Sequence, residues 1–127
     1  MIDFLIAFSD KLESYGNVHF EELSRDDEGK AIIDGIEITY RLAGSISRYS
    51  NDTRQDVSLQ LDIWCLKKDL LKKELVIQDL EKIHRKKYCL NDGIYLVDRD
   101  NLFRIELGDE DKYIMRTRLQ YIVRKLN

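Results

Sequence analysis

The sequence predicts an α+β fold in which two amphipathic helices pack on a mainly antiparallel sheet of about six strands. Apolar residues recur at helical spacing in two segments and alternate with polar residues in several others. Turn-forming residues separate these segments. The expected order is helix, three strands, helix, three strands, which is typical of a sheet with helices packed against it.

The first half of the chain supplies the first helix and the first strands of the sheet. In residues 2–15 the apolar side chains lie three or four positions apart, as on one face of a helix. A short strand is expected at residues 18–23 and a longer one at residues 36–42, where apolar and polar residues alternate. The strongest alternation, at residues 57–65, predicts a strand whose apolar side faces the core.

Two polar segments interrupt these elements. Residues 24–29 are acidic and rich in turn formers, which predicts a loop. Residues 44–54 are small and polar and predict a long hairpin loop. Because this second segment combines Arg48, Tyr49 and Arg54 with small residues, its composition fits either a flexible loop or a segment that folds onto a partner.

The second half of the chain begins with a helix and continues with strands. Apolar residues seven positions apart, with others beside them, predict a second amphipathic helix from residue 67 to about residue 86. Residues 94–97 and 102–107 are expected to form the two strands of a hairpin. Alternation over residues 113–124 predicts a long last strand.

Length and composition indicate one globular domain. The chain has 127 residues, of which 43% are apolar and 35% charged, and a formal net charge of -3. No apolar run approaches the ~20 residues that cross a bilayer, so neither a membrane span nor a signal peptide is expected. Two cysteines, Cys65 and Cys89, fit reduced thiols better than a disulfide framework.

Charge is unevenly distributed along the chain. Residues 1–66 contain six basic and thirteen acidic side chains, whereas residues 67–127 contain fifteen and eleven. Residues 67–87 alone hold eight basic side chains against four acidic ones. This basic segment is either the solvated face of a helix or one half of a head-to-tail contact, in which it meets the acidic side of the next copy. The acidic clusters at residues 26–28 and 109–111 are interpreted as solvated turns.

The sequence contains no pattern typical of catalysis, of a cofactor site or of a metal site. Its six glycines stand apart, whereas a phosphate-binding loop needs them clustered. His19 and His84 lack the partner spacing of a zinc site, and the two cysteines lack the surroundings of an activated thiolate. Residues 98–103 begin like a calcium loop but have Leu and Phe where an oxygen ligand and a glycine are required. We therefore expect no enzyme activity, no cofactor and no metal ion.

Several residues are candidates for an interaction surface. Arg116, Arg118 and Arg124 share the polar side of the last strand, where they are either solvated or paired with carboxylates or phosphates of a partner. Trp64 points away from the apolar row of its strand and is expected to be covered by a helix on the second side of the sheet, with an interface anchor as the alternative. The candidate interface residues are Arg48, Tyr49, Arg54, Arg116, Arg118 and Arg124.

Five segments, taken in their order along the chain, carry a resemblance to a known family. They are ITYRL at 38–42, DVSLQLDIW at 56–64, DRDN at 98–101, DEDKY at 109–113 and RTRLQYIVR at 116–124. In this order they resemble the tail terminator or tail completion proteins of long-tailed bacteriophages, small subunits that close the tail tube and join it to the head. The resemblance spans most of the chain and is one of pattern, without catalytic signatures.

The resemblance implies a structural virion protein of the tail and neck, assembled in the cytoplasm of the bacterial host. It implies an α+β subunit that forms a ring, commonly a hexamer, between the tail tube protein and a head connector protein. It also implies no enzyme activity, with the 44–54 loop directed toward the axis or the tube and the second helix outside the ring. We expect the free protein to be monomeric in dilute solution and to form the ring on its partner, because premature rings would compete with assembly.

Two other functions remain open on the sequence. A head-side connector or stopper protein of the phage neck would also be small, acidic and ring-forming. A small nucleic-acid-binding module would use Arg116, Arg118 and Arg124 with the 67–87 helix, and salt-dependent DNA retention would reveal it. The slightly acidic balance gives no general attraction to nucleic acid, so sequence-specific DNA or RNA is not an expected partner, and neither is a membrane.

Overall fold

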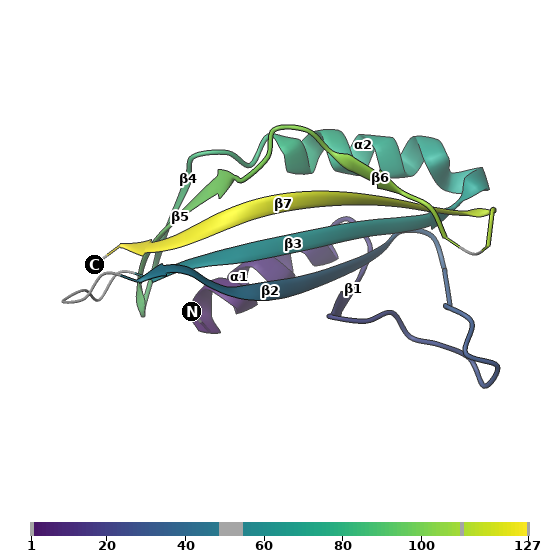
Figure 1. Cartoon of the computed structure of the whole chain (residues 1–127), viewed down its shortest axis with the longest axis horizontal. Coiled ribbons are helices and arrows are strands. Elements are labelled where there is room, and N and C mark those ends of the chain that lie inside the picture. The colour runs from purple at the N-terminus through teal and green to yellow at the C-terminus, as the bar shows by residue number, and fades with distance from the viewer. Residues whose placement is uncertain (1, 49–54, 110, 127) are drawn as a thin grey trace.

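The computed structural model describes residues 2–48, 55–109 and 111–126 of the chain. Within these residues it confirms the predicted α+β class, with two α helices and seven strands in one mixed sheet (Figure 1). In chain order the elements are α1 (Ile2–Glu13), β1 (Asn17–Phe20), β2 (Glu37–Arg48), β3 (Gln55–Leu66), the 3-10 turn η1 (Lys67–Asp69), α2 (Leu70–Glu81), β4 (Lys86–Leu90), β5 (Gly93–Arg99), β6 (Ile105–Leu107) and β7 (Ile114–Leu126).

The strands are ordered β1-β2-β3-β7-β5-β4 across the sheet, and the short β6 also pairs with β7. The β1 and β2 strands run parallel, whereas the other pairs of described strands are antiparallel. The centre of the sheet is formed by β3 and β7, which stay in register from Gln55 opposite Lys125 to Leu66 opposite Ile114. Because side chains alternate along a strand, this pair determines much of what each face of the sheet presents.

Both helices pack on the same face of the sheet, which we call the core face. Alternate apolar side chains of β3 and β7 point to this face and are fully buried, among them Leu61 and Leu119. The Phe8 ring of α1 lies 6.4 Å from the Tyr121 ring of β7. The Tyr121 hydroxyl donates a hydrogen bond of 2.6 Å to the Leu80 carbonyl oxygen of α2. The apolar stripes of both helices therefore belong to one core around this tyrosine.

The opposite face of the sheet, which we call the second face, carries neither of the two described helices. Figure 1 shows the segment 21–36 at the lower right, away from α2. This segment covers one end of the second face with a small apolar cluster. The cluster consists of Leu23, Trp64 and Ile114, with Ala31, Ile33 and Leu66 packed against them. The rest of the second face is left to polar and half-buried side chains of the central strands.

The predicted burial of Trp64 is confirmed, but the prediction that a helix covers it is wrong. Trp64 is only 8% exposed. Its apolar neighbours come from the segment 21–36, from the end of β3 and from the start of β7. A helix cannot take this place, because the apolar stripes of α1 and α2 are both used in the core on the other face.

The second helix is shorter than predicted. The α2 helix ends at Glu81, and the basic residues that follow it lead into the edge strand β4. One of them, Arg85, has a φ of 55°, a left-handed conformation that a helix cannot continue. The sequence pattern does not reveal β4 because its residues show no clean alternation. Tertiary contacts stabilise it instead: Tyr88 lies opposite Tyr95 of β5, and its ring is 5.7 Å from that of Phe4.

The predicted hairpin between residues 94–97 and 102–107 is wrong. The β5 and β6 strands pair with β7, one after the other along the same edge, and β5 forms its hairpin with β4. Between them, the N–H of Asp100 donates to the carbonyl oxygen of Gln120 at 3.0 Å and holds the connection against β7. The 13 residues of β7 make it long enough to pair with both shorter strands on one side.

The predicted loop at residues 44–54 is wrong in its first part. The β2 strand continues to Arg48 and β3 begins at Gln55, so the first residues of the expected loop belong to a strand. The register between β2 and β3 shifts twice in this stretch, as β-bulges cause it to do. Bulges disturb the alternation on which strand prediction depends, which explains the error. Residues 49–54 lie outside the described residues.

Candidate protein interface

The β7 arginines predicted to form an interface lie on the second face, next to carboxylates of neighbouring strands. Asp62 of β3 receives two of them: Arg116 Nη2 lies 2.5 Å and Arg118 Nε 2.9 Å from its carboxylate oxygens. The register explains this contact, because Asp62 pairs with Arg118 and the next outward residue, Trp64, pairs with Arg116. Asp62 is 4% exposed, whereas each guanidinium side chain is about a quarter exposed.

Arg124 forms a second charge cluster farther along the same face. Its guanidinium donates a hydrogen bond to Asp98 of β5, and its Nε lies 3.7 Å from a carboxylate oxygen of Asp56 of β3. The side chain of Arg124 is 27% exposed. All three predicted arginines of β7 are thus paired within the chain, and a partner would meet their outer atoms rather than free cations.

The other three residues predicted for the interface are not placed by the structure. Tyr49 and Arg54 lie outside the described residues. Arg48 is the last residue of β2. Only its backbone is described, and its side chain lies outside the described part. The prediction for these residues therefore stays a prediction.

Trp64 and Arg116 form a fixed unit at the covered end of the second face. The Trp64 indole N–H donates a hydrogen bond of 3.1 Å to Thr39 Oγ1 of β2. The Arg116 guanidinium lies over the indole ring, 4.3 Å from its centroid, while its nitrogens bind Asp62. Arg116 is therefore held by a carboxylate and an aromatic ring at the same time.

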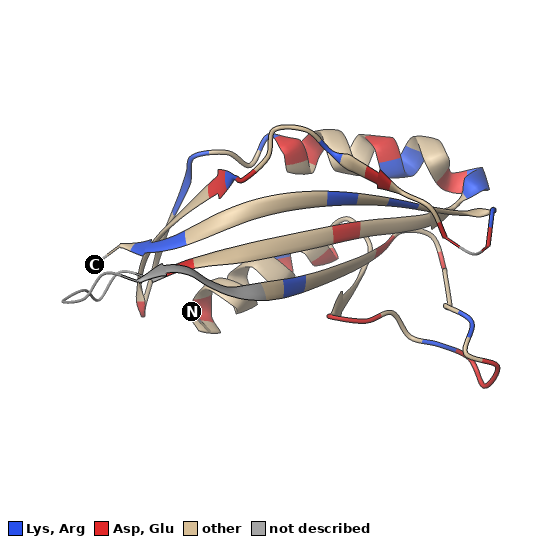
Figure 2. Cartoon of the chain, in the orientation of Figure 1, with Lys and Arg blue, Asp and Glu red and all other residues tan. Residues whose placement is uncertain are grey.

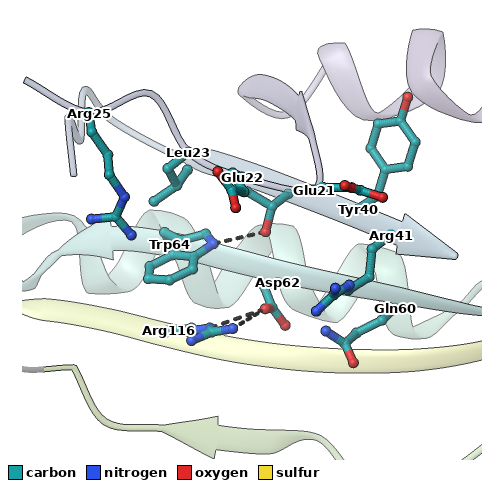
Figure 3. A pocket seen from close by; sticks show the side chains of 11 residues that line it. Glu21, Glu22, Leu23, Arg25, Tyr40, Arg41, Gln60, Asp62, Trp64 and Arg116 are labelled. Carbon is teal, nitrogen blue, oxygen red and sulfur yellow. Dashed lines mark hydrogen bonds and ion pairs between the residues drawn. The ribbon is translucent and has the colours of Figure 1, made fainter. Parts of the chain in front are cut away.

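A pocket of about 200 Å³ opens next to this unit (Figure 3). Figure 3 shows Arg41 of β2 and Gln60 of β3 beside the paired Asp62 and Arg116, with Glu21 and Glu22 on the segment above them. Arg41 is exposed and has no ion-pair partner among the residues that the structure describes. The pocket thus offers charges of both signs beside the fixed Asp62–Arg116 pair, an arrangement suited to a polar side chain of a protein partner.

A larger groove, of about 940 Å³, adjoins Trp64 between the segment 25–33 and the turn that precedes β7. Apolar side chains of the Trp64 cluster form its floor. Its acidic rim consists of Asp26, Glu28, Asp109 and Asp111, and Arg25 and Lys30 also line it. The fold therefore brings residues of both acidic clusters of the sequence to one groove. Their described residues are exposed, as predicted for solvated turns.

Short-range hydrogen bonds fix the acidic rim of this groove. Asp26 Oδ1 accepts the backbone N–H groups of Glu28 and Lys30, each at 2.9 Å. On the other side, Asp111 Oδ1 accepts the N–H of Tyr113 at 2.9 Å. Aspartates form such turns because their short side chains reach backbone donors a few residues ahead. The rim is therefore defined locally by the sequence.

The two sides of the sheet carry opposite charge (Figure 2). The segment 21–34, on the side of the second face, has six acidic and two basic residues. The segment 67–87, which contains α2 on the other side, has eight basic and four acidic residues. In Figure 2 the first segment lies at the lower right, and α2 with the basic stretch after it lies at the top; the packing of Leu23 on Trp64 and of Ile77 on the core assigns the two segments to opposite faces. The uneven distribution of charge along the sequence therefore gives the folded chain one acidic and one basic surface.

The histidines and the buried cysteine occupy structural positions. His19 Nε2 lies 3.6 Å from Glu37 Oε1 on the neighbouring strand, and His84 Nδ1 accepts the N–H of Arg99 at 2.9 Å. Cys65 is fully buried, which confirms its predicted place in the core, and burial raises the pKa of its thiol. Among the described residues, no group of three or more His, Cys, Asp or Glu side chains is arranged to hold a metal ion.

The sequence analysis did not identify Asp62 as the residue that binds two arginines. A signal was present, because Asp62 is the only acidic residue on the polar side of β3 between Ser58 and Trp64. Its partner could not be named without the register of β3 against β7. The groove was missed for a similar reason, since its two rims are about 80 residues apart in the sequence and meet only in the fold.

In the part of the chain that the structure describes, none of the helices has the length and apolar character needed to span a membrane. A scan of protein-family models gives no match to the chain, and a search of curated proteins gives none. The candidate interface is therefore defined by geometry: two hollows on either side of Trp64 on the second face, and a basic surface around α2 on the opposite side.

Proposed function

We propose that this chain is a structural virion protein that caps the tail tube of a long-tailed bacteriophage and forms the head-tail joining interface as a ring. Its partners in this proposal are further copies of itself, the tail tube protein and a head connector protein. The protein assembles in the cytoplasm of the bacterial host and becomes part of the tail and neck of the virion. Its task is binding at defined surfaces, without catalysis.

The separation of charge across the sheet is the observation that carries this proposal. The segments 21–34 and 67–87 have equal and opposite formal charge and lie on different sides of the sheet. A contact between unlike surfaces of successive copies brings these charges together and does not end at two copies. Such a heterologous contact gives a closed ring when the rotation between copies closes.

The arginines of β7 favour a protein partner over nucleic acid. Arg116 and Arg118 share the carboxylate of Asp62, and Arg124 is paired with Asp98. Binding to a phosphate backbone depends on cations that replace condensed counterions, and a guanidinium already paired with a carboxylate contributes little to that exchange. Such cross-strand pairs instead give a sheet a fixed polar surface, which a ring subunit needs.

Purified tails of the phage that encodes this chain provide the test. The protein is mixed with tails that lack their head-proximal cap, and bound protein is located by electron microscopy and counted by mass measurement. We expect a ring at one end of the tube, whereas the protein alone in dilute solution has the mass of a monomer. Tails already joined to heads serve as the control, because their binding site is occupied.

The outcome also separates the two phage functions. Absence of protein from the tube ends would contradict the proposal. Retention on filled heads without tails, in place of retention on tubes, would instead assign the chain to the head side of the neck as a connector or stopper protein.

A further inference from the structure

We propose that the groove beside Trp64 binds the outer face of α2 from a second copy of this chain. The inference rests on the proposed assembly of like copies and names the two surfaces that meet. One surface is hollow with an acidic rim, and the other is convex with basic flanks. They lie on opposite faces of the sheet, because the groove adjoins the Trp64 cluster and α2 packs in the main core.

The groove is large enough for side chains of a packed helix. Its volume is about 940 Å³. Trp64 and Ile114 are buried beneath its floor, and the apolar side chains that the groove still exposes are those of Ala31, Ile33 and Leu66, which are half-buried. Acidic side chains outnumber basic ones around it by four to two. An apolar floor with an acidic rim fits a helix that presents apolar side chains flanked by lysines.

The outer face of α2 has this composition. Leu71 and Leu75 lie one turn apart and are 75% and 60% exposed, on the side of the helix opposite its buried residues. Lys68 and Lys72 are exposed beside them. Within the described residues, no element packs over these two leucines. Apolar side chains of this size at helical spacing are typical of a contact surface.

The acidic residues of α2 are paired within the chain. Glu74 and Glu81 are bound by Arg104, which lies in the connection before β6. These hydrogen bonds raise the pKa of the Arg104 guanidinium, Glu74 contributing most. The two glutamates are thus paired on one side of the helix. Asp79, which is exposed one turn after Leu75, is paired as well, because it accepts a hydrogen bond from Tyr15 and lies 3.8 Å from Lys82 Nζ. Lys68 and Lys72 flank the start of the leucine ridge formed by Leu71 and Leu75.

A second copy is the occupant favoured by these observations, because one chain carries both halves of a complementary contact. The leucine ridge would fill the apolar floor, and Lys68 and Lys72 would face the acidic rim. Since the groove and α2 lie on opposite sides of the sheet, the contact is heterologous and repeats from copy to copy. It would also cover the exposed leucines of each copy except at an open end.

A charge exchange between two variants tests this contact. The groove variant carries Glu28→Lys and Asp109→Lys, and the helix variant carries Lys68→Glu and Lys72→Glu. Each variant alone would place like charges in the contact, so we expect self-association at least about tenfold weaker than that of the wild type. In an equal mixture, the helix of each variant meets the groove of the other with opposite charges. We expect association to return in the mixture, measured by light scattering over a concentration series up to the millimolar range in low salt.

Matched variants control for net charge. Asp10→Lys with Glu13→Lys changes exposed residues of α1 by the same charge as the groove variant, and Lys86→Glu with Lys87→Glu does so for the helix variant on β4. The α1 control should associate like the wild type. The β4 control lowers the charge of the 67–87 segment but keeps the α2 surface, so it should lose less association than the helix variant. A third variant, Leu71→Gln with Leu75→Gln, removes the apolar ridge without a change of charge and should weaken association. Circular dichroism and the urea midpoint establish that each variant is folded.

Three results would overturn the inference. The first is a wild type that stays monomeric over the whole series. The second is association in which the groove and helix variants match the wild type. The third is an equal mixture of the groove and helix variants that associates no more strongly than either variant alone. If the groove variant instead loses only its retention on tail tubes, the groove faces the tube protein. The proposed function has its own test: it is contradicted if wild-type protein is not retained on tail tubes, independently of how strongly the mixed variants associate.

Discussion

Asp62 is the residue on which the polar side of the central strands depends. It is almost fully buried, and it binds the guanidinium groups of Arg116 and Arg118 at the same time. Arg116 in turn lies over the ring of Trp64. A single carboxylate therefore connects the centre of the sheet to the apolar cluster that forms the floor of the groove.

Replacement of this carboxylate by an amide should destabilise the fold. Asp62→Asn keeps the shape of the side chain but leaves two partly buried guanidinium groups without a negative partner, so we expect a loss of about 2 kcal/mol in the free energy of unfolding. Urea denaturation measures the loss, and fluorescence of Trp64, the single tryptophan, reports the change beside Arg116. The control is Asp27→Asn on the exposed 21–34 segment. Equal stability of the two variants would contradict this account.

Gly16 lies at a position where the backbone leaves no room for a side chain. It follows α1 and precedes β1, and a Cβ atom at this position would lie 2.3 Å from the carbonyl oxygen of Ile36. The close approach lets the N–H of Asn17 donate to the same oxygen at 2.9 Å, which starts the parallel pairing of β1 with β2.

We expect Gly16→Ala to reduce the free energy of unfolding by about 1–3 kcal/mol, because backbone atoms must move apart. Gly108→Ala is a matched control, since a Cβ atom there meets nothing within 4 Å, and its effect should stay within about 0.5 kcal/mol. Thermal or urea unfolding of both variants measures the two changes in the free energy of unfolding. The explanation fails if the two alanine variants are equally stable.

At the scale of elements, Tyr15 joins the end of α1 to α2. Its hydroxyl donates a hydrogen bond to Asp79 of α2. Burial, and next this hydrogen bond, raise the pKa of Tyr15 to about 12. Burial also raises the pKa of Tyr88, Tyr95 and Tyr121 in the core. The packing of both helices therefore depends on phenol groups that stay protonated.

The fold should lose stability above pH 10. The phenol of the unfolded chain ionises near its ordinary pKa of 10.0, whereas that of folded Tyr15 ionises near 12, so the unfolded state releases its proton first as the pH rises. The stabilisation is complete below pH 10 and is lost between 10 and 12. Urea midpoints on both sides of pH 10 measure the decrease. Tyr15→Phe should make it less steep, whereas the exposed Tyr113→Phe should not; identical slopes for both variants would refute this role of Tyr15.

Periodicity predicted the elements that have one buried face along their whole length. The helix at residues 2–15 and the strands at 57–65 and 113–124 are found as α1, β3 and β7 within a few residues. Their pattern is continuous because each packs on the core along its length. The class of the fold followed from these elements and the turns between them.

Elements stabilised by their neighbours were not predictable in this way. The β4 strand depends on β5 and on α1, and the end of β2 contains bulges that interrupt its alternation. The pairing of β5 and β6 with the same edge of β7 is a choice between two topologies with similar local sequence. For the candidate site, the sequence indicated the arginines and the acidic turns, whereas their pairing and the groove depended on register.

At the scale of the whole molecule, the charge on the two sides of the sheet should make association sensitive to salt. Attraction between exposed charges acts over ~10 Å at 0.1 M salt and ~3 Å at 1 M. We therefore expect the mass average of the wild type at high concentration to fall as salt is raised. The variant Leu71→Gln with Leu75→Gln should associate more weakly than the wild type, and its association should still fall as salt is raised. A mass that rises with salt would instead mean that apolar contact dominates between copies.

The position of β7 has a consequence for how the protein matures. This strand follows every other strand in the sequence, yet it lies between β3 and β5 in the middle of the sheet. A ribosome thus synthesises β3 about 50 residues before β7, which is its partner in the sheet. Until β7 is made, β3 and β5 each lack their neighbour at the centre of the sheet. Only insertion of β7 brings the rim residues Asp109 and Asp111 next to the 25–33 segment. In the proposed contact between copies, the groove is therefore complete only after β7 has paired with both β3 and β5.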